Sequence, residues 1–392
     1  MKRNRLIVGI GSAGALVIGL APVAMAQTTT TAAAAPHPSV LIGGLHNPKH
    51  ITFGPDGHLY VAESGLGDPA KKNCVTMPGD TGAPTQGCVG KTGAVVWIKG
   101  TTAVPVISGL ESVQEQDSGE TVGAADVAWQ NGKLVVVMQD VDVTADGSTG
   151  LLTGDEFGKA VVAAPGSARS SWALVPDFAA YASEHPQTNQ GGTPGETAND
   201  SDPYAITPYK GGYAVVDAAA NSLLWISPTG QLSTLARFPA QTETAPPGVL
   251  GPVAVTVSAQ AVPTSVAVGP DGALYVGGLR GVPSLPGTAD VYRVVPGHAP
   301  TVYATGFSAI TDIAFDRGGN LLVLEFSTGG LLSPPTTPGA LIKVARYGAH
   351  TRTTIASAGL TQPTGVAVNS HGTIYVANNG ESATNGEIVR VN

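Results

Sequence analysis

This chain has 392 residues, and side chains whose oxygen atoms can bind a cation recur at the ends of its short apolar runs. Some of these runs begin with an aspartate, and others end with a glutamate, an aspartate or an asparagine. The residues that share this placement are Glu63, Asp126, Asp217, Asp312, Glu325 and Asn378. Carboxylate and amide oxygens are the ligands that Ca²⁺ and Mg²⁺ prefer. If the fold brings these side chains together, they must share protons, pair with cations or bind a metal, because like charges repel.

A histidine near this set adds a second kind of chemistry. His50 opens the apolar run that comes before Glu63, and a histidine beside a carboxylate can act as a general base. Two interpretations follow, and the sequence leaves both open. In the first, the catalytic groups are His50, Glu63 and Glu325. In the second, a bound Ca²⁺ or Mg²⁺ is held by Glu63, Asp217, Glu325 and Asn378.

Six repeats of one pattern must position these residues. Each repeat has an alternating apolar run, a turn that contains glycine and a second apolar run, which is typical of a β-hairpin. Two clear copies are "HITFGPDGHLYVAE" from His50 and "SVAVGPDGALYVGG" from Ser265; the other four start at Asp126, Ala205, Asp312 and Gly365. Most copies are followed by two further strand-like runs. Four strands in each of six units predict an all-β fold, a six-bladed β-propeller.

The two ends of the chain are expected to complete one blade together. The sixth unit stops at its third strand, "GEIVRVN", residues 386–392. The opening phrase "PSVLIGGL", residues 38–45, matches a fourth-strand phrase, "TTIASAGL", residues 353–360. The N-terminal strand would therefore complete the last blade and cover two sheet edges that would otherwise be exposed.

The predicted ring brings the polar residues to one mouth of its central channel. We expect the ligand-binding mouth, with His50 and Glu63 beside it, to contain Asp126, Asp217, Asp312 and Asn378. The connections on this face are the long ones, residues 65–92, 111–123, 141–156, 185–203, 240–262 and 327–339. Long loops on a rigid scaffold often carry binding or catalysis, so the sequence favours this face. Acidic residues at these positions can equally be hydrogen-bonding clamps between strands.

Several phrases resemble known propeller families. The unit "QPTGVAVNSHGTIYVANN", residues 362–379, is similar to an NHL-type or streptogramin-lyase-type repeat. A longer resemblance, to the ScyD/ScyE family of exported bacterial proteins, rests on four phrases in order: "GLHNPKHITFGPDGHLYVAESG", "VPDFAAYASEHPQ", "DSDPYAI" and "GLTQPTGVAV". This resemblance implies an exported propeller, with some relatives encoded beside scytonemin pigment genes, and it implies no particular activity. The lyases and lactonases with similar repeats use a divalent ion at the channel mouth, with several histidines in the lyases.

The N-terminus has the pattern of a secretory signal peptide. Three basic residues precede an apolar run from Leu6 to Leu20, and Ala24 and Ala26 are the small residues that a signal peptidase reads. We predict a signal peptide over residues 1–26, a low-complexity spacer over 27–38, a propeller domain over 39–392, and secretion to the extracellular space. No later run approaches the roughly 20 apolar residues of a spanning helix.

Charge and cysteine content narrow the function further. Without the signal peptide, 17 of the 20 Lys and Arg residues remain against 28 Asp and Glu, which argues against nucleic acid and anionic membranes as partners.

Cys74 and Cys88 are the only cysteines, and in an exported protein we expect them to form a disulfide.

The favoured function is an exported binding or interaction module, expected to be a monomer. Its partner would be a small ligand, an extracellular protein or a component of the cell wall. The alternative is a lyase or lactonase that depends on a divalent metal ion at the channel mouth. A third interpretation is an extracellular scaffold.

Overall fold

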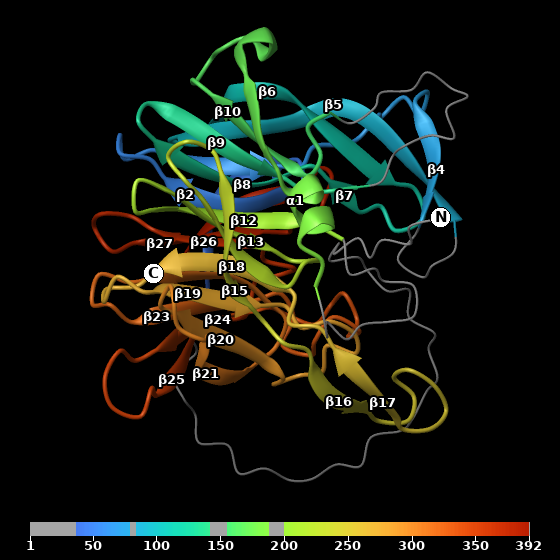
Figure 1. Ribbon diagram of the computed structural model, residues 1–392, viewed down its shortest axis with the longest axis vertical. Helices are drawn as coiled ribbons and strands as arrows, with labels where there is room; N and C mark the ends of the chain where they lie inside the picture. The colour runs from blue at the N-terminus through green and yellow to red at the C-terminus, as the bar shows by residue number, and fades with distance from the viewer. Residues whose placement is uncertain (1–36, 79–83, 142–154, 188–199, 392) are drawn as a thin grey trace.

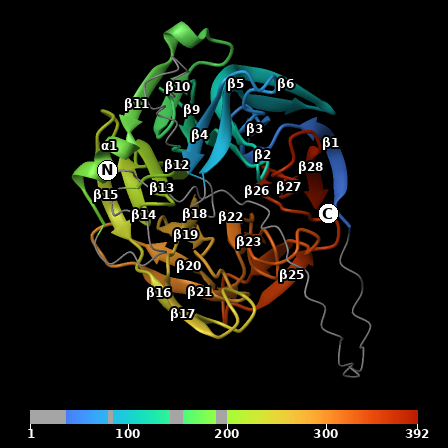
Figure 2. The ribbon, with the colours of Figure 1, turned by 90° about the vertical axis from the view of Figure 1, so that its right-hand side faces the viewer.

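A computed structural model of the chain describes residues 37–78, 84–141, 155–187 and 200–391. The predicted signal peptide and almost all of the predicted spacer lie outside these residues, and so do parts of the connections 65–92, 141–156 and 185–203. Six antiparallel sheets surround a central axis, and Figure 2 looks along that axis. The predicted six-bladed all-β propeller is therefore confirmed. No helix in the described part of the chain is long and apolar enough to cross a membrane.

The six blades are numbered here by their innermost strands, and the strands of each blade are given from the channel outward. Blade 1 contains β2 (Pro48–Phe53), β3 (Leu59–Glu63), β5 (Pro84–Lys99) and β6 (Thr102–Glu115). Blade 2 contains β8 (Ala124–Gln130), β9 (Lys133–Met138), β10 (Lys159–Ala163) and β11 (Ala173–Asp177). Blade 3 contains β12 (Pro203–Tyr209), β13 (Gly212–Asp217), β14 (Ser222–Ile226) and β15 (Leu232–Arg237).

The second half of the ring has the same plan. Blade 4 contains β18 (Pro263–Val268), β19 (Leu274–Gly278), β20 (Ala289–Val294) and β21 (Thr301–Phe307). Blade 5 contains β22 (Ile310–Phe315), β23 (Leu321–Glu325), β24 (Ala340–Val344) and β25 (Arg352–Ala356). Blade 6 contains β26 (Gly365–Val368), β27 (Ile374–Asn378), β28 (Gly386–Val391) and β1 (Ser39–Leu45).

The N-terminal strand closes the ring as the sequence predicts. β1 pairs antiparallel with β28, with Ser39 opposite Arg390 and Leu45 opposite Gly386. A side-chain bond reinforces this closure, because Thr364 Oγ1 in blade 6 donates to the Pro48 carbonyl of blade 1 at 2.7 Å. The last blade is thus built from both ends of the described chain, and its third strand is no longer an open edge.

Threonines near the start of the innermost strands link neighbouring blades elsewhere as well. Thr264 Oγ1 donates to the Ile310 carbonyl at 2.6 Å, and Thr311 Oγ1 donates to the Pro363 carbonyl at 3.0 Å. All three threonines are buried, and a buried hydrogen bond of this kind contributes about 1 kcal/mol. Blades 4, 5, 6 and 1 are therefore fixed to one another close to the channel.

Apolar side chains fill the space between blades. Residues of blade 1, such as Tyr60 and Val95, pack with Val127 and Val136 of blade 2 in one buried cluster. The same alternation recurs around the ring, because successive strand residues point to opposite faces of each sheet and both faces are covered. Burial of this apolar surface is the main source of stability.

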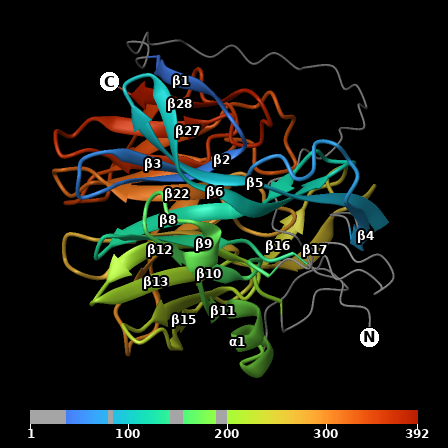
Figure 3. The same ribbon diagram turned by 90° about the horizontal axis from the view of Figure 1, so that it is seen from above.

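Several elements lie outside the six-by-four plan. They are β4 (Cys74–Pro78), which pairs with β5; β7 (Thr121–Val122), which pairs with β6; the hairpin β16 (Gln241–Ala245) and β17 (Val255–Ala259); the 3-10 turn η1 (Arg169–Ser171); and α1 (Phe178–Glu184). Figures 1 and 3 show β4 and the β16–β17 hairpin on the same side of the ring. The stretches 65–92 and 240–262, expected as loops, therefore contain strands of their own.

The expected disulfide is present in one of these additions. Cys74 and Cys88 are bonded and lie directly opposite each other in the β4–β5 register. The bridge joins two strands of a hairpin, so it fixes the extension of blade 1 rather than linking separate blades.

Candidate functional site

Three polar residues of the innermost strands meet in the central channel. His50 of β2, Asp126 of β8 and Asp312 of β22 line one cavity with a volume of 440 Å³. The first residues of the six hairpin repeats thus lie around one axis, and the other three are Ala205, Ser265 and Gly365. The structure brings together the three members that carry a titratable side chain.

The cavity extends from these residues toward the short turns. His50, Asp126 and Asp312 are buried at its base. Its walls follow the second halves of the innermost strands, including Phe53 and Phe315, and reach Val268, which is 38% exposed. The cavity therefore opens on the face of the short turns. The sequence pattern predicts a site on the opposite face, where the long connections lie.

The channel end near the long connections holds paired polar side chains. Lys49, at the start of β2, forms a buried ion pair with Glu381 at 2.5 Å. Tyr204, at the start of β12, is 2% exposed, and its ring lies edge-on to His50 with 5.4 Å between ring centroids. These residues, which the sequence analysis did not single out, occupy the space above the trio. A charged residue at the start of an apolar innermost strand was the signal that could have identified Lys49.

The electrostatics of the trio favour a charged histidine. His50 Nδ1 lies 3.4 Å from Asp126 Oδ2, and its Nε2 lies 3.1 Å from the Thr311 carbonyl oxygen. Burial by itself lowers the pKa of His50, but the charges of Asp312 and Asp126 and the hydrogen bonds to Asp126 and Thr311 outweigh it and raise the pKa to about 9. At neutral pH the imidazole is protonated, so it can donate hydrogen bonds but is a poor general base.

The two aspartates also hold neighbouring blades together. Asp126 accepts hydrogen bonds from the backbone N–H groups of Val127 at 2.7 Å and of Ile206, in blade 3, at 2.8 Å. Asp312 makes the same pair of contacts, including one to blade 6. Burial raises the pKa of Asp312 to about 6, with a smaller opposing effect from His50. The trio therefore sets two carboxyl groups around one imidazolium.

Four of the predicted residues, called the second ring here, lie at the ends of the second strands of their blades. Each of the four accepts a hydrogen bond from the backbone segment that leads into its own blade. Glu63 accepts from His46 N, Asp217 from Asp202 N, Glu325 from Ser308 N and Asn378 from Thr361 N. They lie in blades 1, 3, 5 and 6, and each ties the end of a second strand to the segment that enters the same blade. Among the residues that the structure describes, no group of three or more His, Cys, Asp or Glu side chains is arranged to hold a metal ion.

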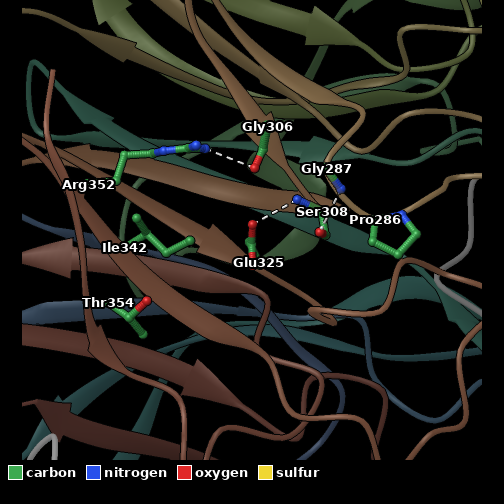
Figure 4. Close-up of a pocket in the computed structure, with 8 residues that line it drawn as sticks. All are labelled: Pro286, Gly287, Gly306, Ser308, Glu325, Ile342, Arg352 and Thr354. Carbon is green, nitrogen blue, oxygen red and sulfur yellow. Dashed lines mark hydrogen bonds between the residues drawn. The ribbon is translucent and has the colours of Figure 1, made fainter. Parts of the chain in front are cut away.

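One member of this second ring lines a cavity of its own. Glu325 lies in a crevice of 450 Å³ between blades 4 and 5, and Figure 4 shows it below the guanidinium of Arg352. Burial raises the pKa of Glu325 to about 7, and the hydrogen bond from Ser308 and the charge of Arg352 oppose this rise. Arg352 begins an outermost strand and belongs to no repeated polar position, so no sequence pattern marks it.

Comparison with known proteins adds structural neighbours only. No protein-family model matches the chain, and no curated protein matches it. A streptogramin B lyase structure superposes with a TM-score of 0.46 at 12% identity, covering 90% of this chain and 97% of that one. A glucose dehydrogenase gives 0.45 at 13%, covering 91% and 99%. A protein of unknown function from Bacteroides thetaiotaomicron gives 0.49 at 9%, covering 90% and 75%. Identities this low do not transfer an activity to this chain.

Proposed function

We propose that this protein is a binding module that takes a small molecule into its central channel from the face of the short turns. The observation that carries the proposal is the 440 Å³ cavity with His50, Asp126 and Asp312 at its base. Ligand sites are commonly concave and mostly apolar, with a few convergent polar groups that fix the orientation of the ligand. This cavity is concave, its lining includes apolar side chains such as Phe53 and Phe315, and three polar side chains converge at its base.

The walls and the base together indicate the class of ligand. Phe53, Phe315 and Val268 offer apolar surface near the opening, whereas the base holds two carboxyl groups, Asp126 and Asp312, beside the single imidazole of His50. A molecule with an apolar body and a cationic head group would place the body against the walls and the head group near the aspartates. An aryl or alkyl amine is the simplest member of this class.

A substitution that fills the opening tests the proposal. Val268→Trp adds a large side chain at the mouth, whereas Val302→Trp makes the same change at an exposed position of β21, away from the channel. Binding of a panel of aryl and alkyl amines would be measured by saturation-transfer NMR and by the shift in melting temperature. We expect binding to the native protein and to Val302→Trp, and its loss in Val268→Trp.

A charge substitution tests the role of the base. Asp312→Asn removes one negative charge, and its amide oxygen can accept one of the two backbone hydrogen bonds that the two carboxylate oxygens accept in the native protein; circular dichroism checks that the variant is folded. Amine affinity should fall about tenfold, roughly 1.4 kcal/mol, while the affinity of the matching neutral alcohol should stay the same. The proposal is wrong if the native protein binds no member of the panel, or if Val268→Trp binds as well as the native protein.

Export, and membership of the ScyD/ScyE family, are part of this proposal and rest on the sequence phrases. Sequencing the N-terminus of the protein recovered from culture medium tests export, with Gln27 expected as the first residue. Partners of the long connections, whether an extracellular protein or a wall component, belong to the same proposal. The alternative of a metal-dependent lyase or lactonase has weaker support, because each of its four expected ligands accepts a hydrogen bond from the entry segment of its own blade.

A further inference from the structure

The crevice between blades 4 and 5 is separate from the channel and is not explained by the proposed function. It has a volume of 450 Å³, and its lining comes from both blades. Pro286 and Ile342 provide apolar surface, while Glu325, Arg352 and Ser308 provide polar groups (Figure 4). A concave cavity of this size that combines apolar surface with convergent polar groups can hold a small polar molecule.

Glu325 and Arg352, which have opposite charges when Glu325 is ionised, line this crevice without pairing to each other. Glu325 is 4% exposed, and its Oε1 accepts a hydrogen bond from Ser308 N at 2.8 Å. Arg352 is exposed, and its Nη1 donates to the carbonyl oxygens of Thr305 and Gly306. The ion pairs found in the described part of the chain include none between Glu325 and Arg352. A guanidinium has five N–H donors, so Arg352 retains donors for a ligand.

The spacing of the two charges follows from the backbone groups that hold them. Glu325 is held by Ser308 and Arg352 by Gly306, two residues away along the chain. Two residues of fully extended chain span roughly 7 Å, and Gly306 has a φ of 81°, so the two anchoring residues lie no further apart than that. An α-amino acid carries its ammonium and carboxylate groups about 3 Å apart, as bond lengths dictate. With a hydrogen bond of about 2.8 Å at each end, the amino acid can bridge two protein groups at this separation if the three segments are not collinear.

Blade 6 shows why the crevice is open in blade 5. Asn378 occupies the strand position of Glu325, and its Nδ2 donates to Glu387 Oε1 at 2.8 Å across the strand pair. The residue opposite Glu325 in blade 5 is Ala340. Because alanine has no group that could reach Glu325, the carboxyl has no equivalent partner on the neighbouring strand.

We propose that the crevice between blades 4 and 5 binds a free α-amino acid, with the ammonium group on Glu325 and the carboxylate on Arg352. The hydroxyl of Ser308 accepts a hydrogen bond from Gly287 N at 3.1 Å, so its own hydrogen is available to the carboxylate. The walls formed by Pro286 and Ile342 would contact the side chain of the ligand. Both charged groups of the ligand are needed, because each pairs with one of the two charged residues.

The experiment measures binding of the free amino acids to the purified protein by isothermal titration calorimetry. The variants are Glu325→Gln, in which an amide oxygen can still accept from Ser308 N, and Arg352→Gln, which changes an exposed side chain. The matched control is Glu63→Gln, which makes the same change at the same strand position in blade 1. Two analogues of each binding amino acid are added: the N-acetyl form, without the ammonium group, and the amide, without the carboxylate.

We expect at least one amino acid to bind, with affinity at least tenfold lower for each crevice variant and each analogue. Glu63→Gln and the channel variant Val268→Trp should bind it as the native protein does, so that a failure of the channel proposal leaves this result intact. The inference is overturned if no free amino acid binds, if either analogue binds as tightly, or if Glu63→Gln weakens binding as much as Glu325→Gln. Circular dichroism of each variant confirms that it is folded.

Discussion

The polar residues of the innermost strands and those at the ends of the second strands lie one strand apart, yet they have different surroundings. His50, Asp126 and Asp312 share one cavity on the axis. Glu63, Asp217 and Glu325 each accept a hydrogen bond from the entry segment of their own blade. The second strands lie one strand further from the axis than the innermost strands. Side chains at corresponding positions of different blades therefore share a cavity on the innermost strands but contact their own blade on the second strands.

The difference shows that the strand position of a polar residue in the repeat decides which other polar residues it can contact. On the innermost strands, a residue faces its counterparts in other blades across the channel, so unlike residues such as His50 and Asp126 can form one site. On the second strands, the nearest polar groups belong to the same blade, and a carboxylate becomes a local clamp. Glu325 departs from this pattern only because the crevice beside it also contains Arg352.

Removal of a second-ring clamp should have the largest effect on stability. Asp217 is fully buried and accepts hydrogen bonds from Ser201 Oγ, Asp202 N and Ala220 N. Asp217→Ala leaves these donors unsatisfied, and we expect the free energy of unfolding to fall by roughly 4 kcal/mol. Urea denaturation followed by circular dichroism measures this change.

The matched variant Asp217→Asn sharpens the test. Both backbone donors bond to Oδ1, which an asparagine retains, so a loss of only about 1 kcal/mol is expected. If Asn were as destabilising as Ala, the negative charge rather than the hydrogen bonds would be essential, and the interpretation as a clamp would not hold.

The free energy of unfolding should depend on pH because His50, on an innermost strand, has a raised pKa. The pKa of His50 is about 9 in the folded protein and 6.5 in the reference state, so its contribution is fully present below pH 6.5 and is lost as the pH rises through 9. The difference corresponds to at most about 3 kcal/mol. The free energy of unfolding, measured from pH 6 to pH 10, should fall over this interval.

His50→Gln provides the control for this pH dependence. The variant has no imidazole, so the decrease associated with His50 should disappear while other titrations remain. An identical pH profile for the variant and the native protein would show that His50 is not the group responsible.

The smallest effect is expected at Glu63. Its pKa is raised mainly by burial, while the hydrogen bond from His46 N opposes the rise. Glu63→Gln keeps an acceptor for that N–H group and removes a charge that is costly to bury, so the free energy of unfolding should change by less than about 1 kcal/mol. A much larger loss in urea denaturation would indicate that Glu63 has a charged partner and is more than a clamp.

Much of the fold could be predicted because hairpins and turns are local. The alternating runs on either side of "GPDG" and the match between 38–45 and 353–360 require only neighbouring residues or a simple count. The pair β10 and β11 carried a weaker signal, because the long connection 141–156 separates β10 from the hairpin before it. The β16–β17 hairpin was missed because no repeated phrase marks it.

The candidate site was less accessible to prediction. His50, Asp126 and Asp312 could be placed on the channel from their strand positions alone. The direction in which the cavity opens could not, because Lys49 and Tyr204, near the long connections, occupy that end through contacts with other blades. Arg352 and Glu325 are 27 positions apart in the chain and meet in the crevice between blades.

The sequence by itself determined the number of blades, the strand that closes the ring and the disulfide, because each depends on local patterns or on the presence of only two cysteines. The tertiary structure decided which polar side chains share a cavity and which serve only their own blade. The physical reason is that side-chain convergence depends on distance from the propeller axis and on the packing of neighbouring blades. Neither the distance from the axis nor the packing between blades can be derived from the spacing of residues along the chain.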